Sequence, residues 1–320
     1  MDSVTKMKIS TEQINSIVQQ AFGNKIISAV ELSDGWANSA YDLLMIDGRT
    51  AILKAAPLKD IPVMRYENKI MTAEVEVLKL VGQQSRVPVP EVHLHDASCT
   101  IIPTEYFIME KLNGSPYNHV KDSLSEQERK SIEYELGKYN AVINEIKGEK
   151  FGYFAQMEQG RAHWQDAFYE MISGVLADGR DANVELPASY AVIEQEIASR
   201  MDCLVEVQEP KLVHWDLWDG NVFVHDKQIS GIIDFERAMW GDHLIEHYFS
   251  HFGPSNAFEQ GYGQGPLTAN EQARRALYDL YLDLILLIEC DYRQYSNESH
   301  VKWAQDNMAA GWARFISLKL

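Results

Sequence analysis

Polar side chains in the second half of the chain have the residue types that chemistry on phosphate groups requires. The segment VHWDLWDGNVFV contains His214, Asp216 and Asn221, and Asp234 stands 13 residues beyond Asn221 at the end of an apolar stretch. A carboxylate can take the proton of a hydroxyl group, and carboxylate and amide oxygens are ligands that Mg²⁺ accepts. We therefore predict phosphoryl transfer, with Asp216 as the catalytic residue and Asn221 and Asp234 as magnesium ligands.

The spacing H-x-D-x-x-x-x-N of the first three residues is that of a kinase catalytic loop. Taken singly, each residue also has a structural explanation. A histidine often only bonds to backbone, and Asp and Asn often form local turns. We expect His214 to hold the loop rather than to move protons. The functional interpretation therefore depends on further parts of such a site that precede the loop in the expected order.

A lysine and a glutamate form one of these parts, because such a kinase holds nucleotide phosphates with a strand lysine that a helix glutamate keeps in place. Lys54 lies in the predicted strand TAILKA, and Glu74 in the following helix is its best partner. Glu67 and Glu76 are the competitors, and Glu76 should point elsewhere because residues two apart do not share a helix face. The turn that covers the phosphates is predicted in LSDGWANSAY, where Gly35 is the one glycine.

The first part of the chain has the pattern of a small antiparallel sheet with helices. Strand character covers residues 26–32, 41–46, 51–55 and 106–109. Asp47-Gly48 is a strong hairpin signal, and apolar residues at helical spacing predict a helix over 66–81. We place the boundary between two lobes near residue 112, where the last of these strands opens into a loop.

Beyond residue 112 the pattern is mainly helical. Long amphipathic segments cover residues 126–146, 164–176, 190–205, 271–290 and 300–318. Two short strand-like pieces, 222–224 and 229–233, follow the catalytic loop and precede Asp234. Since no linker or repeat separates the two parts, we expect them to share a cleft.

Together these segments resemble the aminoglycoside phosphotransferase and choline kinase family of small-molecule kinases. The resemblance covers most of the chain and includes DGWANSAY, Lys54, Glu74, FIMEKLNG, HWDLWDGN and IIDFE. It implies an α+β, bilobal, protein-kinase-like fold. Residues 1–112 would form a small N-terminal antiparallel sheet lobe, and residues 113–320 a larger, mainly helical C-terminal lobe.

The resemblance also implies a nucleotide site. ATP would be the phosphate donor and Mg²⁺ its metal ion. The adenine would hydrogen-bond the hinge backbone at Met109, Glu110 and Leu112, while Gly35, Lys54 and Glu74 would serve the phosphates. The product would be a small molecule phosphorylated on a hydroxyl group.

Two departures from the family pattern bear on the acceptor. Trp215 stands after His214 where these enzymes commonly have glycine, and Asn144 stands where many members have histidine. The LWDGN core also resembles the LWSGN stretch of fructosamine kinases. The acceptor alternatives therefore stay open between an aminoglycoside-like or otherwise cationic molecule, a sugar, a glycated amine and another metabolite.

The net charge of the protein disfavours some classes of binding partner and favours others. The 320 residues contain 29 Lys and Arg against 47 Asp and Glu, a formal net charge of −18, which disfavours nucleic acid as a partner. Residues 1–112 contain 11 basic and 14 acidic side chains, and residues 113–320 contain 18 and 33. The acidity thus belongs to the lobe expected to bind the acceptor. It favours a cationic small molecule, with solubility as the alternative explanation.

Membrane association is not expected from the sequence. The first residues lack the apolar core of a signal peptide. The longest apolar stretch, Leu277–Ile288, is interrupted by Asp279 and Asp283. We therefore expect a soluble, cytoplasmic protein.

Other functions and residues compete with these assignments. A protein kinase is disfavoured because IIDFERAMWGD replaces D-F-G and no A-P-E follows. A non-catalytic ATP-binding regulatory module is disfavoured because every charged catalytic position is filled, and an unrelated structural protein is the third alternative. For substrate stacking we consider Trp215, Trp218, Trp240 and Trp303, with Trp218 and Trp240 favoured. For recognition of an amino group we consider Asp219, Glu236, Asp242 and Glu246.

Overall fold

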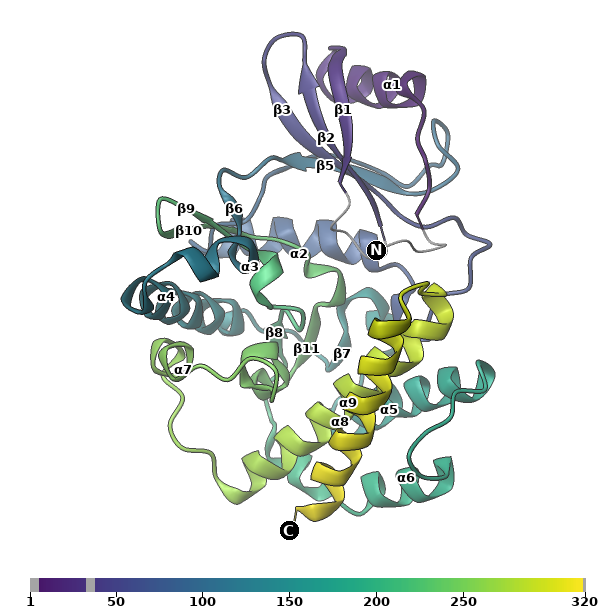
Figure 1. Ribbon diagram of the computed structural model, residues 1–320, viewed down its shortest axis with the longest axis vertical. Helices are drawn as coiled ribbons and strands as arrows, with labels where there is room; N and C mark the ends of the chain where they lie inside the picture. The colour runs from purple at the N-terminus through teal and green to yellow at the C-terminus, as the bar shows by residue number, and fades with distance from the viewer. Residues whose placement is uncertain (1–5, 33–37, 319–320) are drawn as a thin grey trace.

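The computed structural model describes residues 6–32 and 38–318, which form two lobes stacked along the long axis of the molecule (Figure 1). An antiparallel sheet with α1 dominates the upper lobe, and helices dominate the lower one. The predicted α+β fold with a small sheet lobe and a mainly helical lobe is confirmed.

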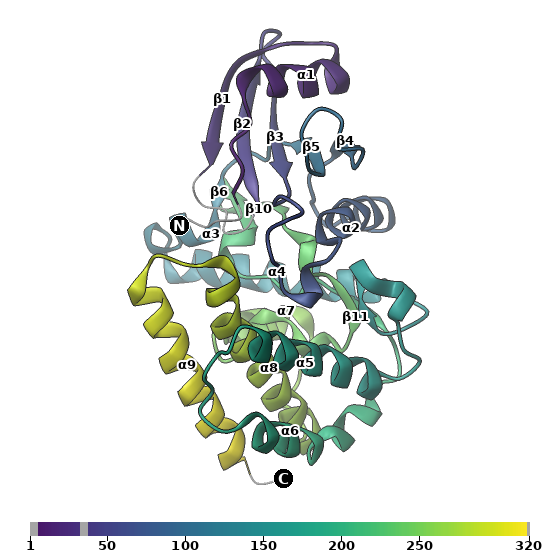
Figure 2. The same cartoon turned by 90° about the vertical axis from the view of Figure 1, so that its right-hand side faces the viewer.

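The N-terminal lobe is a five-stranded antiparallel sheet in the order β1-β2-β3-β5-β4. Its elements are α1 (Thr11–Phe22), β1 (Ile26–Leu32), β2 (Ser39–Met45), β3 (Thr50–Ala55), α2 (Ile70–Gln84), β4 (Val92–Asp96) and β5 (Tyr106–Glu110). Figure 2 shows α1 and α2 lying along different parts of this sheet.

The side chains of β5 point alternately to the two faces of the sheet and contribute to two hydrophobic cores. Tyr106 and Ile108 pack with α1, while Phe107 and Met109 join the core that contains α2. Successive side chains of a strand point to opposite faces, so a fully apolar strand must be covered on both. β3 is paired on both sides, with β2 and β5, and so gives Lys54 a rigid support.

Local signals fix the ends of the first elements. Ser10 and Gln13 form a capping box at the start of α1, and Gly48 between β2 and β3 has φ 86°, as the predicted tight hairpin turn requires. The predicted helix over 66–81 is wrong at its start. Lys69 has φ 61°, a left-handed conformation that interrupts the helix, so a short 3₁₀ helix, η1 (Arg65–Glu67), precedes α2.

The C-terminal lobe contains most of the helices. Its elements are β6 (Ser115–Pro116), α3 (Tyr117–Val120), α4 (Glu126–Glu145), β7 (Gly152–Tyr153), α5 (Trp164–Asp181), α6 (Tyr190–Ala198), β8 (Lys211–Val213), β9 (Val222–His225), β10 (Gln228–Ile232), β11 (Met239–Gly241), α7 (Asn256–Tyr262), α8 (Ala269–Arg293) and α9 (Glu298–Ser317). The expected helix over 190–205 is two pieces, since α6 ends at Ala198 and a 3₁₀ helix (Met201–Glu206) follows. The short helix α7 was not predicted.

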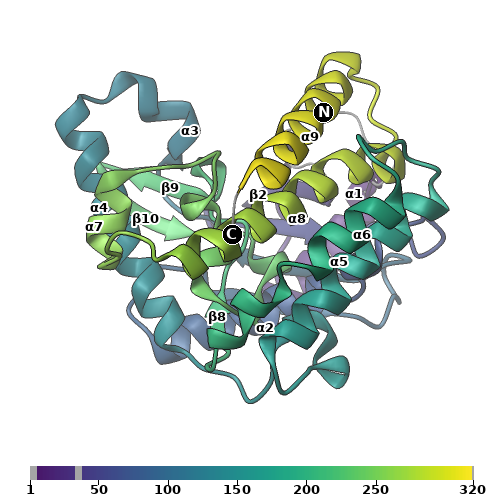
Figure 3. The same ribbon diagram turned by 90° about the horizontal axis from the view of Figure 1, so that it is seen from below.

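Long helices form the base of this lobe. Seen from below, α5, α8 and α9 run beside one another (Figure 3), and their apolar faces share one core that includes Phe168, Tyr281 and Met308. Two small sheets, β10-β9-β6 and β7-β11-β8, lie between these helices and the upper lobe. Across the described residues, each helix is too short or too polar to cross a bilayer.

The chain crosses between the lobes after β5. This strand ends at Glu110, whereas β6 at residues 115–116 already pairs with β9 in the second lobe. The predicted division near residue 112 falls in this crossing and stays a prediction of the domain limits.

Candidate active site

Lys54 and Glu74 meet between the sheet and α2. The Lys54 ammonium lies 2.6 Å from Glu74 Oε2, and both residues are buried. Of the three glutamates considered from sequence, Glu67 instead contacts Arg293, and Glu76 is exposed on the outer face of α2. The helix periodicity explains this choice, since Glu74 shares a face with Val77, Leu78 and Val81.

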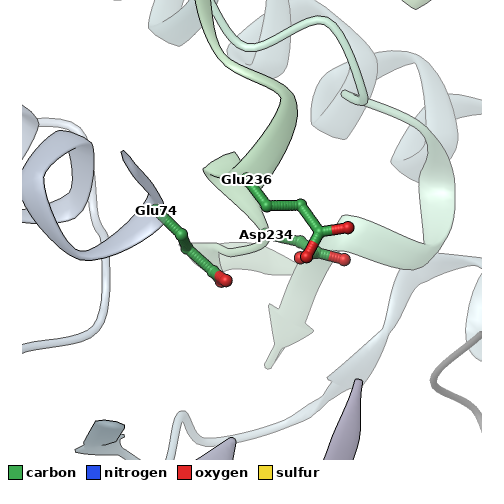
Figure 4. A group of neighbouring side chains, drawn as sticks. All are labelled: Glu74, Asp234 and Glu236. Atoms are coloured by element: carbon green, nitrogen blue, oxygen red, sulfur yellow. The ribbon is translucent and has the colours of Figure 1, made fainter. Parts of the chain in front are cut away.

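Two further carboxylates meet the same ammonium. Asp234 Oδ1 lies 2.5 Å and Glu236 Oε2 3.4 Å from Lys54 Nζ. Figure 4 shows the side chains of Glu74, Asp234 and Glu236 pointing toward one another from α2 and from the segment after β10. One lysine thus balances part of the charge of two buried carboxylates, Glu74 and Glu236, and of the half-buried Asp234.

The proton affinities of these groups follow from burial and from Lys54. Burial and the neighbouring carboxylates raise the pKa of Glu74 to about 8 despite its ion pair. Burial also raises the pKa of Glu236, with the Asp234 charge acting in the same direction. At Asp234 burial acts upward too, but the Lys54 ammonium outweighs it and lowers the pKa. Asp234 is therefore the anionic member of the group that best suits a cation.

The predicted catalytic loop connects β8 to β9 and is closed by its own hydrogen bonds. Asn221 Nδ2 donates to the Asp216 backbone oxygen at 2.8 Å and to Asp216 Oδ2 at 3.2 Å. The Ile233 backbone N–H donates to the Asn221 carbonyl at 3.0 Å, which ties the loop to the strand end before Asp234. The structure therefore brings Asp216, Asn221 and Asp234 into one site, as their spacing predicts.

Burial raises the pKa of the Asp216 carboxyl to about 8, although the Arg237 charge acts against this rise. A carboxyl with a pKa near neutrality holds a proton more strongly than an ordinary aspartate and is better matched to a base. The position suits a group that must accept a proton from a hydroxyl.

His214 and Glu246 hold the loop from behind. His214 Nε2 donates to the Ile233 carbonyl at 2.8 Å, and its Nδ1 accepts from the Asp216 backbone N–H at 3.2 Å. This arrangement requires a neutral ring, and burial lowers the pKa of His214 accordingly. The Glu246 carboxylate accepts the N–H groups of Trp215 at 3.1 Å and Leu217 at 3.3 Å. His214 thus has the contacts of the loop-holding role predicted for it.

Backbone strain marks two positions of the site. Trp215 has φ 62° and Asp234 φ 68°, conformations that cost energy for any residue except glycine. Trp215 stands where the family commonly has glycine. Its ring stacks on Tyr281 at 5.3 Å and packs against Tyr66 and Tyr153, so apolar burial offsets the strain of the backbone. The other departure, Asn144, donates to the Leu212 carbonyl at 2.6 Å and supports β8.

The predicted hinge lies at the end of β5. The Glu110 backbone N–H donates to the Glu91 carbonyl at 2.8 Å, and Met109 is 7% exposed. The Leu112 side chain lies against Gly231 of β10, where a Cβ atom would come within 2.3 Å of Leu112 Cδ1. Leu112 is therefore fixed over the second lobe. The last predicted nucleotide contact, Gly35, lies outside the described residues.

Sequence reasoning missed two neighbours of the site, Asn38 and Arg237, and the loop-holding contacts of a third, Glu246. Asn38 donates to Glu236 Oε2 at 2.6 Å, which connects the N-terminal lobe to the segment after β10. Arg237 places its charge near Asp216, and Glu246 holds the loop. Asn38 lies within the segment DGWANSAY, and Arg237 directly follows DFE. The sequence signal that could have found both residues was their proximity to these two predicted site segments.

The four acidic residues considered for amino-group recognition are engaged within the protein. Asp219 accepts from Lys121 at 2.8 Å and from the Tyr248 hydroxyl. Asp242 accepts from Arg274 at 2.9 Å, and Glu236 and Glu246 have the contacts described above. These partners argue against a role for any of the four in binding an amino group.

The residues of the site fit a hard divalent cation. Glu74, Asp234 and Glu236 each offer an oxygen, and the three oxygens lie within 4.8 Å of one another. Since Asn221 uses its amide nitrogen on Asp216, its amide oxygen is the atom suited to a metal ion. An all-oxygen donor set is what Mg²⁺ requires.

Comparison with known proteins decides the family. The model of the phosphotransferase enzyme family matches residues 28–279. The chain belongs to this family. A probable ketoamine kinase of Vibrio cholerae serotype O1 is 29% identical over 226 residues, or 66% of this chain and 71% of that protein. A probable ketoamine kinase of Vibrio vulnificus is 26% identical over 273 residues, or 81% and 86%.

Solved structures share the fold of this phosphotransferase. A thermostable mutant of an aminoglycoside phosphotransferase, in complex with ADP and hygromycin B, has a TM-score of 0.65 at 18% identity and covers 96% of this chain and all of that one. Family membership makes the protein a kinase that transfers a phosphoryl group to an alcohol group of a small molecule. The protein-kinase and structural-protein alternatives are thereby excluded.

Proposed function

We propose that this phosphotransferase is dependent on ATP and Mg²⁺ and phosphorylates a hydroxyl group of a cationic or sugar-like small molecule. The observation that carries the proposal is the meeting of Lys54, Asp234 and the Asp216–Asn221 loop at one place between the lobes. These parts come from β3, the end of β10 and the loop after β8, and only this fold brings them together.

On the nucleotide side, Lys54 neutralises phosphate charge and Glu74 keeps its ammonium in place. The adenine binds the hinge backbone between Met109 and Leu112. The Glu110 N–H already donates to Glu91, so the hinge groups next to it carry this recognition. The related aminoglycoside phosphotransferase was solved with ADP, which supports an adenine nucleotide as the donor.

Asn221 and Asp234 hold the magnesium ion, and Glu236 is the next carboxylate beside them. The ion supplies charge neutralisation on the phosphates. Lys54 Nζ lies 2.5 Å from Asp234 Oδ1, so the ammonium and a metal ion would share this carboxylate. Lys54 also has Glu74 as a partner at 2.6 Å, so its ammonium would stay paired if a metal ion took part of the Asp234 carboxylate.

Asp216 orients the acceptor hydroxyl and takes its proton. The hydroxyl oxygen forms a bond to the terminal phosphorus of ATP, the bond from that phosphorus to ADP breaks, and the proton passes to the Asp216 carboxylate. Asn221 fixes this carboxylate through Oδ2 at 3.2 Å.

Charge and aromatic surface support the acceptor class. The excess of acidic residues in 113–320 favours a cation. Of the tryptophans considered from sequence, Trp215 and Trp240 are core residues at 4% and 8% exposure, whereas Trp303 is 43% exposed and stacks on His300 at 5.5 Å. Of the two tryptophans favoured from sequence, Trp240 is therefore buried, whereas Trp218 is half-buried. A glycated amine is the second candidate acceptor, because the two Vibrio relatives reported above are probable ketoamine kinases.

The test is a screen for ATP consumption with Mg²⁺ against amino alcohols, aminoglycosides, glycated amines and free sugars. With the acceptor found, Asp216→Asn should retain the fold and the thermal shift by Mg-ATP but lose transfer. Asp226→Asn, in the exposed turn between β9 and β10, is the matched control and should keep the wild-type rate. Wild-type turnover in Asp216→Asn would refute the assignment. ATP binding without turnover on any acceptor would favour the regulatory-module alternative.

A further inference from the structure

A second set of buried charges lies behind the nucleotide site. Arg237 Nη2 contacts Glu289 Oε2 at 3.1 Å, and Arg293 Nη2 contacts Glu289 Oε2 at 3.3 Å and Glu67 Oε1 at 2.8 Å. The four side chains are 10% exposed or less. We call this set, Arg237, Glu289, Arg293 and Glu67, the rear ion chain. Its two positive and two negative charges balance.

The ends of the rear ion chain attach to the two segments that define the nucleotide site. Arg237 is three residues beyond Asp234, in the 3₁₀ helix η6 (Phe235–Arg237). Glu67 closes η1, and α2, which carries Glu74, begins three residues later at Ile70. Glu289 and Arg293 are the two inner members of the rear ion chain, and both belong to the last turns of α8. The far end of α8 therefore bridges the two segments.

The Lys54 contacts and the rear ion chain link α2 and η6 on two opposite sides. Lys54 joins Glu74 of α2 to Asp234 before η6 on the nucleotide side. On the opposite side, Glu67 and Arg237 are joined through α8. We propose that Glu67, Glu289, Arg293 and Arg237 are positioning residues that hold α2 against η6, so that Glu74 stays on Lys54 without bound nucleotide. The proposal rests on the proposed function, because it assigns Glu74 and Lys54 to the ATP site.

Apolar packing alone does not give α2 a fixed position. The buried face of α2 contacts η6 and shares a core with Phe235, but these apolar contacts are non-directional. The start of α2 also lacks a side-chain cap, because Lys69 provides none and has φ 61°. Ion pairs with two defined partners have a specific geometry and supply what this helix end lacks.

The catalytic loop is part of the same arrangement. The Arg237 guanidinium lies over the ring of Tyr66 at 5.5 Å and that of Trp215 at 5.9 Å. Tyr66 is the neighbour of Glu67 in η1, and Trp215 precedes Asp216. One arginine therefore contacts both the segment that leads to Glu74 and the loop that carries the catalytic aspartate.

The break at Lys69 explains why Glu67 does not compete for Lys54. In one continuous helix, Glu67 and Glu74 would lie two turns apart on the same face and both would approach the sheet. The left-handed residue turns η1 away from the axis of α2, and Glu67 then faces α8. Glu67, which the sequence analysis considers as an alternative partner of Lys54, is thus proposed to hold the helix that carries Glu74.

The test uses Glu67→Gln, which removes one charge and keeps an acceptor for the Met64 N–H that now lies 2.8 Å from Glu67 Oε2. Arg293 retains Glu289 as a partner, so the variant should fold, and thermal unfolding checks this. We expect the dissociation constant for Mg-ATP to be at least tenfold larger than in wild type. The KM for ATP should rise by a larger factor than the factor by which kcat falls. The control is Glu158→Gln, whose partner Lys69 is also next to α2 but exposed; it should change the constant less than twofold.

A double-mutant cycle separates positioning from general damage. If Glu67 acts through Glu74, the effect of Glu67→Gln on Mg-ATP binding should fall below twofold in a Glu74→Gln background. An equal effect in both backgrounds would overturn the proposal. Arg293→Lys, which keeps the charge but loses the forked contact, should give an intermediate loss.

A measurement without nucleotide keeps this inference distinct from the proposed function. In Glu67→Gln, the backbone amides of α2 should exchange with deuterium at least tenfold faster than in wild type, while those of β2 and β3 should not change. Unchanged exchange in α2 would overturn the rear ion chain as a positioning device. A wild-type protein that shows no thermal shift with Mg-ATP would instead contradict the ATP site, whatever the exchange result.

Discussion

Replacing Lys54 by methionine tests the central ion cluster most directly. The ammonium lies within 3.4 Å of Glu74, Asp234 and Glu236, and its removal leaves two buried carboxylates and the half-buried Asp234 without this cation. Breaking a buried ion pair from one side costs about 3–5 kcal/mol. With an unfolding entropy of about 2.1 cal/mol/K for each of the 320 residues, this cost lowers Tm by about 4–7 °C.

The sign of the pH dependence follows from the same geometry. Without Lys54, burial and mutual repulsion keep the pKa values of the remaining carboxyls above those of the unfolded chain, as burial already does for Glu74. The folded variant then binds more protons than the unfolded chain, so its stability falls as pH rises. The deficit relative to wild type should therefore be larger at pH 8 than near pH 5.5. Mg²⁺ should raise Tm more in the variant than in wild type, because the ion replaces the lost charge.

The assay is differential scanning calorimetry at both pH values, with and without Mg²⁺. Lys111→Met is the matched control, since its ammonium pairs with Asp42 at 2.5 Å but both side chains are at least 30% exposed. We expect a loss of about 1 kcal/mol or less in this control. A Lys54→Met variant as stable as wild type at pH 8, or a deficit that ignores both pH and Mg²⁺, would refute the reasoning.

Two further predictions concern stability. Asp242 is buried, and although burial acts in the opposite direction, its bonds with His243 and the Arg274 charge lower its pKa to about 2. Such a group contributes about 2 kcal/mol above pH 4, which is lost as pH falls toward 2. Asp242→Asn should thus show a constant loss of stability in urea from pH 8 to pH 5, and a loss that vanishes within that range would contradict this origin. At Gly311 in α9, a Cβ atom would lie 1.9 Å from Asp283 Oδ2, so Gly311→Ala should push α8 and α9 apart and cost about 1–3 kcal/mol. At Gly174 in α5 nothing lies within 4 Å, so Gly174→Ala should be neutral or stabilising, and equal losses in both variants would count against the close contact.

Short-range signals explain why much of the fold was predictable. The capping box at Ser10 and the hairpin glycine Gly48 act over a few residues, and the long helices have one apolar face each. The errors share the opposite property. The break of α2 at Lys69 and the end of α6 at Ala198 occur within segments whose apolar spacing favours a continuous helix. Contacts with distant residues, such as that of Glu67 with Arg293, accompany the first break.

The candidate site divides in the same way. The spacing of His214, Asp216 and Asn221 predicts a kinase-like loop, and the hydrogen bonds that close this loop lie within eight residues. The helix period selects Glu74 over Glu76 for the same local reason.

Partners far apart in the chain were decided by the tertiary structure alone. The approach of Glu236 to both Lys54 and Asn38 joins residues about 180 or more positions apart. The support of Trp215 by Tyr281 and Glu246, and the path from Arg237 to Glu67 through α8, are contacts of the same kind. No periodicity encodes such contacts, since they exist only when helices and strands pack and the cost of burying each charge is offset by a partner from another element. The sequence by itself indicated the class of reaction and the residues proposed for it, whereas packing decided which charges hold those residues in place.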